Sequence, residues 1–302
     1  MSSGSIISLN GVITPAEEAR IPIMDRGFLF GDGIYETGRT YSSCFLFLEE
    51  HLRRLRTSAE RLHIPLPWDD KYLVDQLIRT ARAQELPDVY FRIIVTRGVV
   101  DYLGLDVGLS AFEPSLQPSL VIVIQPLHLP DYEKGMTLIT SQVQRNSPKA
   151  QDPSIKTCNY LNSLLALWDA KKAKADDAIM LDANGWVAEG TTFSLFGVDA
   201  NQTLLTPSLD IGILDSIMRR HVLELAHRHG LSTQEGKWSH IEFKKCREIF
   251  IASSVREVLG ISKWDDTTYP CPGPLTLEMD NWLHETIVSY YSNPAHVRFR
   301  EA

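Results

Sequence analysis

Segments with the hydrophobic period of a helix alternate along the whole chain with segments rich in β-branched and aromatic residues. This alternation limits the fold more than any other feature, because each kind of segment must bury its own apolar side. For a helix it is clearest in Leu48, Leu52, Leu55, Ala59 and Leu62, which recur at spacings of four and three and predict one buried stripe. The chain has no internal repeat and no low-complexity tract, so a mixed α/β fold is predicted.

The remaining elements are predicted from the same two patterns. Strands are expected over Val89–Thr96 and Glu248–Ser253 and over residues 120–125, 136–143, 177–182 and 192–198. A helix over residues 159–174 is expected to bury Leu161, Leu164, Leu165 and Trp168. A helix over residues 215–228 can be capped by Asp215 or Ser216, and the tail over residues 293–302 is expected to fray.

A stretch punctuated by Pro and Gly, LHLPDYEKG, follows Pro126 and is typical of a connection between domains. The length of 302 residues is enough for two domains of ordinary size. We therefore expect an N-terminal α/β domain over residues 1–125, a linker over residues 126–136 and a C-terminal α/β domain over residues 137–302.

Composition excludes several classes of protein. A formal net charge of −8 and a pI near 5.6 argue against a nucleic-acid partner, which usually meets a basic face. The four cysteines are scattered, with no C-x-x-C pair and no histidine at ligand spacing, so neither a metal site nor a disulfide framework is expected. No membrane span and no signal peptide are visible, and a cytoplasmic protein is expected.

Three residue patterns could carry chemistry. Lys156, in SIKTCNYLN, precedes a helix among residues that could desolvate it, and a buried lysine of lowered pKa suits Schiff-base chemistry. Glu189, in GWVAEGTTFSLFGV, could hold a pyridinium nitrogen protonated. GILDSIMRR begins a helix, and the free N–H groups of its first turn could bind a phosphate. Considered singly, a surface lysine, a solvated glutamate and a hydrated helix end are the commoner interpretations.

A fourth segment, DRGFLFGDGIYETGR over residues 25–39, is a glycine-bearing loop without the Rossmann spacing. In chain order, DRGFLFGDGIYET, EEHLRRL, SIKTCNYLNSLLA, VAEGTTFSLFGV, GILDSIMRR and IFIASSVREV resemble the class IV, fold-type-IV pyridoxal-phosphate enzymes. These are the branched-chain aminotransferases, the D-amino-acid aminotransferases and the aminodeoxychorismate lyases. The resemblance runs from about residue 11 to about residue 261, and each motif supplies a part that the cofactor needs.

The resemblance assigns the main cofactor-binding residues. Lys156 matches the catalytic lysine that carries the cofactor and then moves the proton between the substrate Cα and the cofactor. Glu189 matches the glutamate paired with the pyridine nitrogen. Arg54, in HLRRL, matches the arginine that binds the phosphate. The alternative is that Arg54 lies on a solvated helix face and binds no ligand.

Further cofactor contacts follow from the same resemblance. The N–H groups of Ile217 and Met218 match the phosphate-binding turn, in which Ser216 replaces the usual glycine and Met218 the usual threonine. One hydroxyl contact is thereby lost, and the second phosphate-side loop, with Ser253 and Ser254, is expected to offset it. Tyr160 falls where many members place a tyrosine near the phenolic oxygen of the cofactor, with helix packing as the alternative.

The choice within the family depends on few residues. Tyr35 occupies the aromatic position that lines the aminotransferase pocket, NYLNS resembles the branched-chain enzymes, and no R-x-H carboxylate trap follows Thr96-Arg97-Gly98. The form IMR and Thr37 resemble the lyases instead. The candidates for binding the substrate carboxylate are Arg39, Arg92 and Arg97.

The resemblance therefore implies a two-domain fold-type-IV enzyme with pyridoxal 5′-phosphate in the cleft between the domains, and a homodimer whose partner completes each substrate pocket. The reaction expected is a ping-pong transamination between a branched-chain-like L-amino acid and a 2-oxo acid. A D-amino-acid or (R)-amine transaminase and a 4-amino-4-deoxychorismate lyase are the alternatives within the family. A non-catalytic α/β interaction protein is the alternative of another class.

Overall fold

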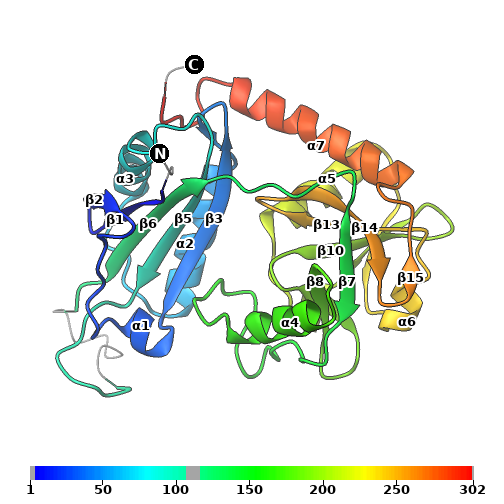
Figure 1. Cartoon of the computed structure of the whole chain (residues 1–302), viewed down its shortest axis with the longest axis horizontal. Helices are drawn as coiled ribbons and strands as arrows, with labels where there is room; N and C mark the ends of the chain where they lie inside the picture. The colour runs from blue at the N-terminus through cyan, green and yellow to red at the C-terminus, as the bar shows by residue number, and fades with distance from the viewer. Residues whose placement is uncertain (1–3, 107–115, 301–302) are drawn as a thin grey trace. The chain divides into compact units, whose positions relative to one another are not determined.

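The computed structural model describes residues 4–106 and 116–300, in which the chain folds into two compact units. Unit 1 comprises Met1–His128, Ile155–Asn159 and Ile287–Ala302, and unit 2 comprises Leu129–Ser154 and Tyr160–Thr286. Both units combine helices with a sheet (Figure 1). The mixed α/β class predicted from the sequence is confirmed.

Unit 1 is built on a six-stranded antiparallel sheet of order β2-β1-β6-β5-β3-β4. Its strands are β1 (Ile6–Leu9), β2 (Val12–Pro15), β3 (Gly33–Tyr41), β4 (Cys44–Phe45), β5 (Val89–Thr96) and β6 (Ser119–Pro126). Alternate residues of β5 are buried, which is the period of a strand with one face against a core. The strands predicted over Val89–Thr96 and residues 120–125 are thereby confirmed.

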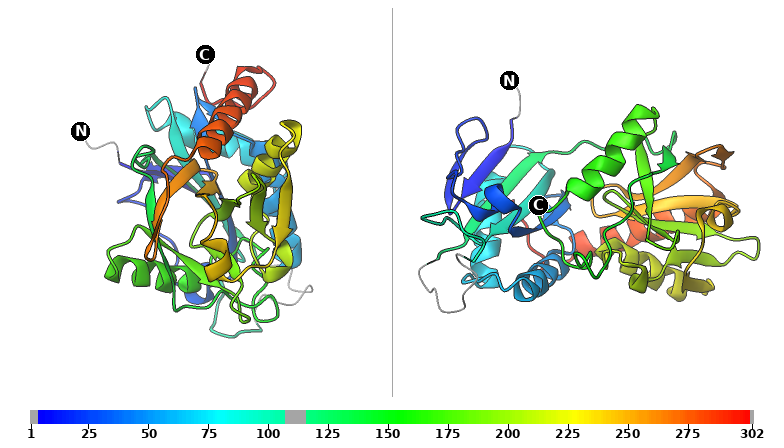
Figure 2. Two further views of the ribbon diagram at one scale, coloured as in Figure 1. Left: turned by 90° about the vertical axis from the view of Figure 1, so that its right-hand side faces the viewer. Right: turned by 90° about the horizontal axis from the view of Figure 1, so that it is seen from below.

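Two helices of unit 1 cover the core face of this sheet (Figures 1 and 2). They are α2 (Leu48–Arg61) and α3 (Asp70–Arg82), whereas the short α1 (Arg26–Phe30) buries only Arg26. The predicted stripe of α2 is buried from Leu48 to Ala59, and Leu73 and Leu77 of α3 pack into the same cluster. Asp69 caps α3 by accepting a hydrogen bond from the Tyr72 N–H at 2.7 Å.

Unit 2 contains a nine-stranded mixed sheet, in which β7 pairs in parallel with β8 and β14. Its strands are β7 (Met136–Thr140), β8 (Asp177–Leu181), β9 (Val187–Gly190), β10 (Ser194–Val198), β11 (Leu204–Pro207), β12 (Thr233–Gly236), β13 (Glu248–Ser253), β14 (Glu257–Trp264) and β15 (Thr267–Thr268). Its helices are α4 (Leu161–Lys172), η1 (Leu209–Ile211), α5 (Ile217–Arg228), α6 (His240–Phe243) and α7 (Pro274–Ser292), which continues into unit 1. All the elements predicted here have counterparts.

The division of the chain differs from the predicted linear one. Ile155–Asn159 belongs to unit 1, so Lys156 does not lie in a C-terminal domain as expected. The reason is backbone pairing with β3: the Tyr35 N–H donates to the Lys156 carbonyl at 3.0 Å, and the Cys158 N–H donates to the Gly33 carbonyl at 2.8 Å. A single predicted boundary at residues 126–136 cannot describe a chain that passes back into unit 1 at residues 155–159.

The predicted buried side of α4 is wrong. Leu161, Leu164, Leu165 and Trp168 are 68%, 55%, 47% and 64% exposed. The residues that α4 buries are Ser163, Ala166 and Ala170, which pack with Ala178 and Met180 of β8. Small side chains allow the helix to approach the sheet closely, and the large apolar stripe faces outward.

The C-terminal segment does not fray within the described residues. Phe299 is fully buried in the core of unit 1, where its ring centroid lies 5.6 Å from that of Phe45. The Arg82 side chain donates to the Phe299 carbonyl at 2.6 Å. The backbone of Arg298 forms an isolated antiparallel β-bridge with that of Cys44. Burial of the Phe299 ring therefore anchors a C-terminal segment that the sequence predicted to fray.

Among the helices of residues 4–106 and 116–300, none is both long and apolar enough to cross a membrane.

Candidate active site

Lys156 is held at the outer edge of β3 by its own backbone. Its carbonyl accepts from Tyr35, its N–H donates to Ser58 Oγ of α2 at 3.4 Å, and the next residue, Thr157, bridges Ile34. Gly33 leaves room on both sides of β3, since a Cβ there would stand 2.9 Å from the Val95 carbonyl oxygen of β5 and 3.3 Å from Cys158 Sγ of the Lys156 segment. The Lys156 Nζ lies 4.4 Å from the centroid of the Tyr35 ring. The amine thus lies beside an aromatic face, on a segment whose backbone pairs with β3.

Arg54 of α2 forms a buried ion pair with Glu36 of β3. The Nε and Nη2 atoms donate to the two carboxylate oxygens at 2.7 and 2.8 Å, and His51 Nδ1 lies 2.7 Å from Oε2. His51 and Arg54 are three residues apart, which places both on the face of α2 that meets β3. Arg54 is therefore not part of a solvated helix face, since its side chain is only 10% exposed.

The charges in this cluster follow from burial and proximity. Burial works against the ionised form of Glu36, yet the Arg54 guanidinium and the His51 ring lower the pKa of the carboxyl to about 2. Burial lowers the pKa of His51, and Arg54 and Lys156 lower it further, against the opposing effect of Glu36. At neutral pH the carboxylate is charged and the imidazole is neutral, so His51 Nδ1 carries the proton that Glu36 accepts.

Arg92 lies on the opposite face of the same sheet. It pairs with Thr37 across β3 and β5, so it shares a face with Thr37 and Tyr35. Its guanidinium carbon is 3.9 Å from the centroid of the Tyr35 ring, and its Nε is buried without a hydrogen-bond acceptor among the described residues. The Thr37 hydroxyl donates to the Phe91 carbonyl at 3.0 Å. Arg92 and Lys156 thus meet at one aromatic ring.

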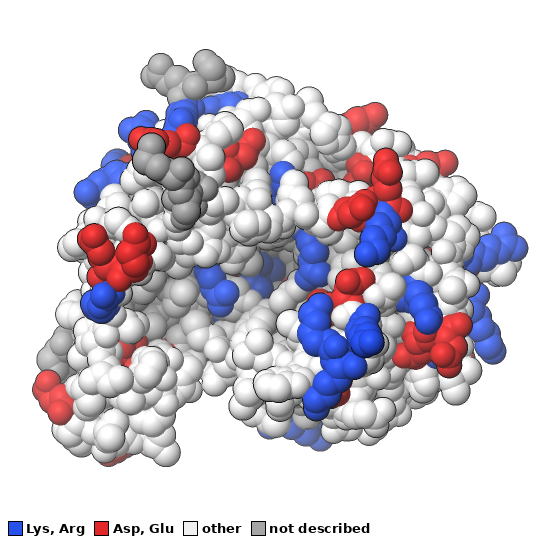
Figure 3. Space-filling model, viewed as in Figure 1, with Lys and Arg blue, Asp and Glu red and all other residues white. Residues whose placement is uncertain are grey.

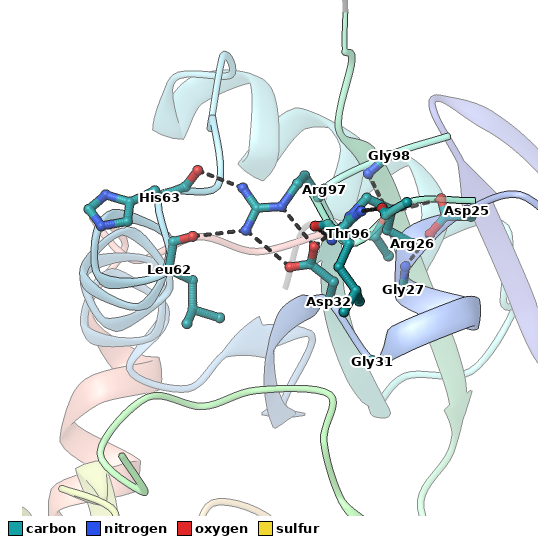
Figure 4. A network of polar contacts seen from close by, with 12 residues as sticks. Asp25, Arg26, Gly27, Gly31, Asp32, Leu62, His63, Thr96, Arg97 and Gly98 are labelled. Atoms are coloured by element: carbon teal, nitrogen blue, oxygen red, sulfur yellow. Dashed lines mark hydrogen bonds and ion pairs between the residues drawn. The ribbon is translucent and has the colours of Figure 1, made fainter. Parts of the chain in front are cut away.

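Arg97 is engaged in a different way (Figure 4). Its Nε and Nη2 donate to Asp32 at 2.7 and 3.1 Å, and its two Nη atoms also donate to the carbonyls of His63 and Leu62. Asp32 additionally accepts from Arg26 at 2.7 Å. Arg97 therefore ties the end of α2 to the turn before β3. Arg39, the third candidate, is buried with its guanidinium 4.3 Å from the centroid of the Tyr41 ring.

In unit 2, Glu189 is the residue before the last of β9 and is buried. Arg145 Nη2 lies 2.6 Å from its Oε1, and the Leu214 N–H donates to both carboxylate oxygens at 3.2–3.3 Å. Leu214 belongs to the segment that leads into α5, so the same carboxylate also holds the approach to that helix. The carboxylate is therefore held by a guanidinium on one side and by a backbone N–H on the other.

The N-terminus of α5 follows directly. Ser216 is the N-cap and accepts from the Arg219 N–H at 3.4 Å, and Ile217 and Met218 are fully buried. Their N–H groups occupy the first turn, where no intrahelical acceptor is available. Of the two predicted caps, Ser216 is the one used, while Asp215 pairs with Arg220 at 2.9 Å.

The other predicted cofactor contacts lie in unit 2 as well. Ser253 ends β13, where its hydroxyl accepts from the Arg256 N–H at 3.1 Å, and Ser254 follows in the turn to β14. Tyr160 is the N-cap residue of α4, and its carbonyl accepts from the Leu164 N–H at 2.9 Å. Their contacts to a cofactor stay predictions.

Three residues that contact the predicted site residues were not anticipated: Glu36 and His51, which join Arg54 in one cluster, and Arg145, which pairs with Glu189. Glu36 and His51 lie inside two of the motifs described above, DRGFLFGDGIYET and EEHLRRL, whereas Arg145 lies outside all of them. For Glu36 and His51 the only signal in the sequence is a titratable residue close to Tyr35 or Arg54, and for Arg145 the sequence offers no local signal. On the face shown in Figure 3, acidic and basic side chains are interspersed rather than gathered into one basic surface.

Comparison with known proteins identifies the group to which this arrangement belongs. Residues 33–264 match the family model described as Amino-transferase class IV. A putative branched-chain-amino-acid aminotransferase of Methanocaldococcus jannaschii is 34% identical over 86% of this chain and 88% of its own. D-alanine aminotransferase of Bacillus licheniformis is 29% identical over 94% of this chain and 97% of its own. Branched-chain amino acid aminotransferase of Thermobaculum terrenum, solved in its PLP form, has a TM-score of 0.84 at 25% identity and covers 98% of both chains.

The family model and the aminotransferase relatives define an enzyme of the transferase class. The family model spans most of the chain and includes Lys156, Glu189 and Arg54. The chain belongs to the class IV aminotransferases.

Proposed function

We propose that this chain is a pyridoxal-phosphate-dependent transaminase that moves an amino group between a branched-chain-like L-amino acid and a 2-oxo acid. The observation that carries the proposal is Lys156, whose backbone is fixed on β3 with its amine beside Tyr35 and Arg92. A reactive amine, an aromatic surface and a cation for a carboxylate are what an amino-acid substrate requires. The similarity to branched-chain aminotransferases supports the substrate class.

The residues present fit pyridoxal phosphate by their chemistry. Lys156 offers an amine for the aldehyde, Glu189 an anionic acceptor for the ring nitrogen, and Arg54 and the first turn of α5 donors for the phosphate. When bound, the cofactor supplies an electron sink for the charge that develops at the substrate Cα. Arg145 and the Leu214 N–H hold the Glu189 carboxylate in place, where it would accept a hydrogen bond from the ring nitrogen. Lys156 moves the proton to and from the substrate Cα.

Arg92 is the best candidate for the substrate carboxylate. Its guanidinium lies on the ring that Lys156 approaches, whereas Arg97 already serves Asp32 and two backbone carbonyls. Arg92→Met is expected to raise KM for both substrates roughly 10- to 100-fold, because a charge-assisted hydrogen bond contributes about 1.5–3 kcal/mol. Steady-state kinetics with an unchanged cofactor spectrum would verify this. An unchanged KM would assign the carboxylate to another residue.

We further propose a homodimer in which the exposed stripe of α4 contacts a second copy. Leu161, Leu164, Leu165 and Trp168 form one apolar face at helical spacing, the pattern of a helix that packs against a partner. Leu164→Glu is expected to weaken dimerisation at least 100-fold, since an uncompensated buried charge costs roughly 3–5 kcal/mol. Light scattering after size exclusion measures this.

Leu277→Glu is the matched control, because Leu277 is a 48% exposed leucine on another helix, α7. It is expected to leave the mass unchanged. A Leu164→Glu variant with the wild-type mass at every concentration would rule out the α4 contact.

A cytoplasmic location is part of the proposal and is supported by four cysteines that are all free thiols.

The test of the substrate class is a set of half-reactions. Purified holoenzyme is mixed separately with L-leucine, L-glutamate, D-alanine, an aromatic primary amine and aminodeoxychorismate, and its visible absorbance is followed. Bleaching by L-leucine or L-glutamate supports the proposal. Bleaching only by D-alanine or the amine would replace the substrate and keep the transaminase, and pyruvate release from aminodeoxychorismate alone would identify a lyase.

A further inference from the structure

The buried carboxylate of Glu36 has no role in the reaction proposed above. Its side chain is fully inaccessible, and it accepts hydrogen bonds from Arg54 Nε, Arg54 Nη2 and His51 Nδ1 at 2.7–2.8 Å. A buried ion pair contributes little net stability compared with an apolar pair of the same volume, because both charges lose their hydration. Stability alone therefore does not account for the buried Glu36–Arg54 pair. A role of Glu36 in orienting the Arg54 side chain does account for it.

Glu36 fixes the orientation of the guanidinium. The two parallel hydrogen bonds occupy the edge formed by Nε and Nη2, and such bidentate contacts define the plane of an arginine as well as its position. His51 holds the same carboxylate from its other side, packed edge-on against Phe91 with ring centroids 5.8 Å apart. Two residues of α2 thus restrain the carboxylate. The carboxylate in turn fixes the plane and the direction of the Arg54 guanidinium.

One strand connects this pair to the reactive lysine. Tyr35 and Glu36 are adjacent on β3: the Tyr35 N–H holds the Lys156 carbonyl, and the Glu36 side chain holds Arg54. Ser58 of α2 contacts the Lys156 N–H from the helix that carries Arg54. The positions of the amine and the guanidinium are therefore set relative to each other by β3 and α2.

We propose that Glu36, with His51 as its second partner, is a positioning residue that aims Arg54 at the phosphate of the cofactor. The inference rests on the proposed function, in which Arg54 binds that phosphate. It predicts that Glu36 affects the recognition of the phosphate specifically, without contacting it.

The test compares two ligands of the apoenzyme, pyridoxal 5′-phosphate and pyridoxal, which lacks the phosphate. Glu36→Gln keeps the shape of the side chain but removes its charge, and the amide NH2 cannot accept a hydrogen bond from Arg54. Titration by absorbance is expected to show roughly tenfold or greater weakening for the phosphorylated ligand, about 1.4 kcal/mol. Affinity for pyridoxal is expected to be unchanged. The ratio of the two dissociation constants is independent of the fraction of folded protein.

Asp32→Asn is the matched control, because it also removes a largely buried carboxylate, 14% exposed, that pairs with arginines in unit 1. It is expected to lower stability and leave the ratio as in the wild type. In an Arg54→Met background, Glu36→Gln is expected to have no further effect on the ratio, and Arg54→Lys supplies a second background if that variant does not fold.

Equal weakening for both ligands, or a full effect of Glu36→Gln in the absence of Arg54, would overturn the positioning role alone. A wild-type apoenzyme that binds pyridoxal phosphate no better than pyridoxal would overturn the assignment of Arg54 to the phosphate. A wild-type protein that binds neither would overturn the proposed function itself.

Discussion

Lys156→Ala is expected to abolish transamination, with a loss of kcat of at least ~10⁴-fold, because the variant lacks both the amine that carries the cofactor and the group that moves the Cα proton. The fold is expected to persist, since Lys156 is held by its backbone N–H and carbonyl, which alanine retains. The assay measures turnover of L-leucine with a 2-oxo acid. Borohydride reduction followed by peptide mass analysis is expected to find the cofactor on Lys156 in the wild type and on no peptide of the variant.

Lys149→Ala provides the comparison, because Lys149 is an exposed lysine seven residues earlier in the same loop region. It is expected to retain full turnover and the reducible adduct. Normal turnover by the Lys156 variant, or a reducible adduct on a different lysine, would show that another amine carries the cofactor.

The sequence predicted the elements of the fold where a clear period was present. The stripe of α2 and the alternation in β5 were correct because each element buries one face against a core in its own unit. The stripe of α4 has an equally clear period but lies on the outside. Periodicity identifies an apolar face and says nothing about which surface covers it, so an exposed apolar face has the same pattern as a face in the core.

The candidate site could be predicted only in part for a related reason. Lys156, Arg54 and Glu189 stand in short motifs that can be read from one segment of sequence. Their partners, Glu36 and Arg145, are 18 and 44 residues away and meet them only through strand pairing and helix packing. The membership of Lys156 in unit 1 was missed likewise, because it depends on backbone hydrogen bonds to β3 that leave no trace in composition.

Glu189→Gln is expected to reduce kcat by on the order of 10²–10³-fold while the cofactor stays bound. The neutral amide cannot hold a proton on the ring nitrogen, so the charge that develops at the substrate Cα is stabilised less. Arg145 would then have no anionic partner at Oε1, and the contact to the Leu214 N–H would weaken. Because the phosphate is assigned to Arg54 and the first turn of α5, binding is expected to weaken far less than turnover. Stopped-flow half-reactions and titration of the apoenzyme measure the two effects separately.

Glu248→Gln is the control for the loss of a buried carboxylate in the same unit. Glu248 accepts from the N–H groups of Leu275 and Thr276 at 3.2 and 3.0 Å and so supports the first turn of α7. This control is expected to lower the melting temperature without the specific loss of kcat. If Glu189→Gln instead lowered affinity and stability in proportion to turnover, Glu189 would act by holding Leu214 and the approach to α5. The electronic role would then have to be assigned elsewhere.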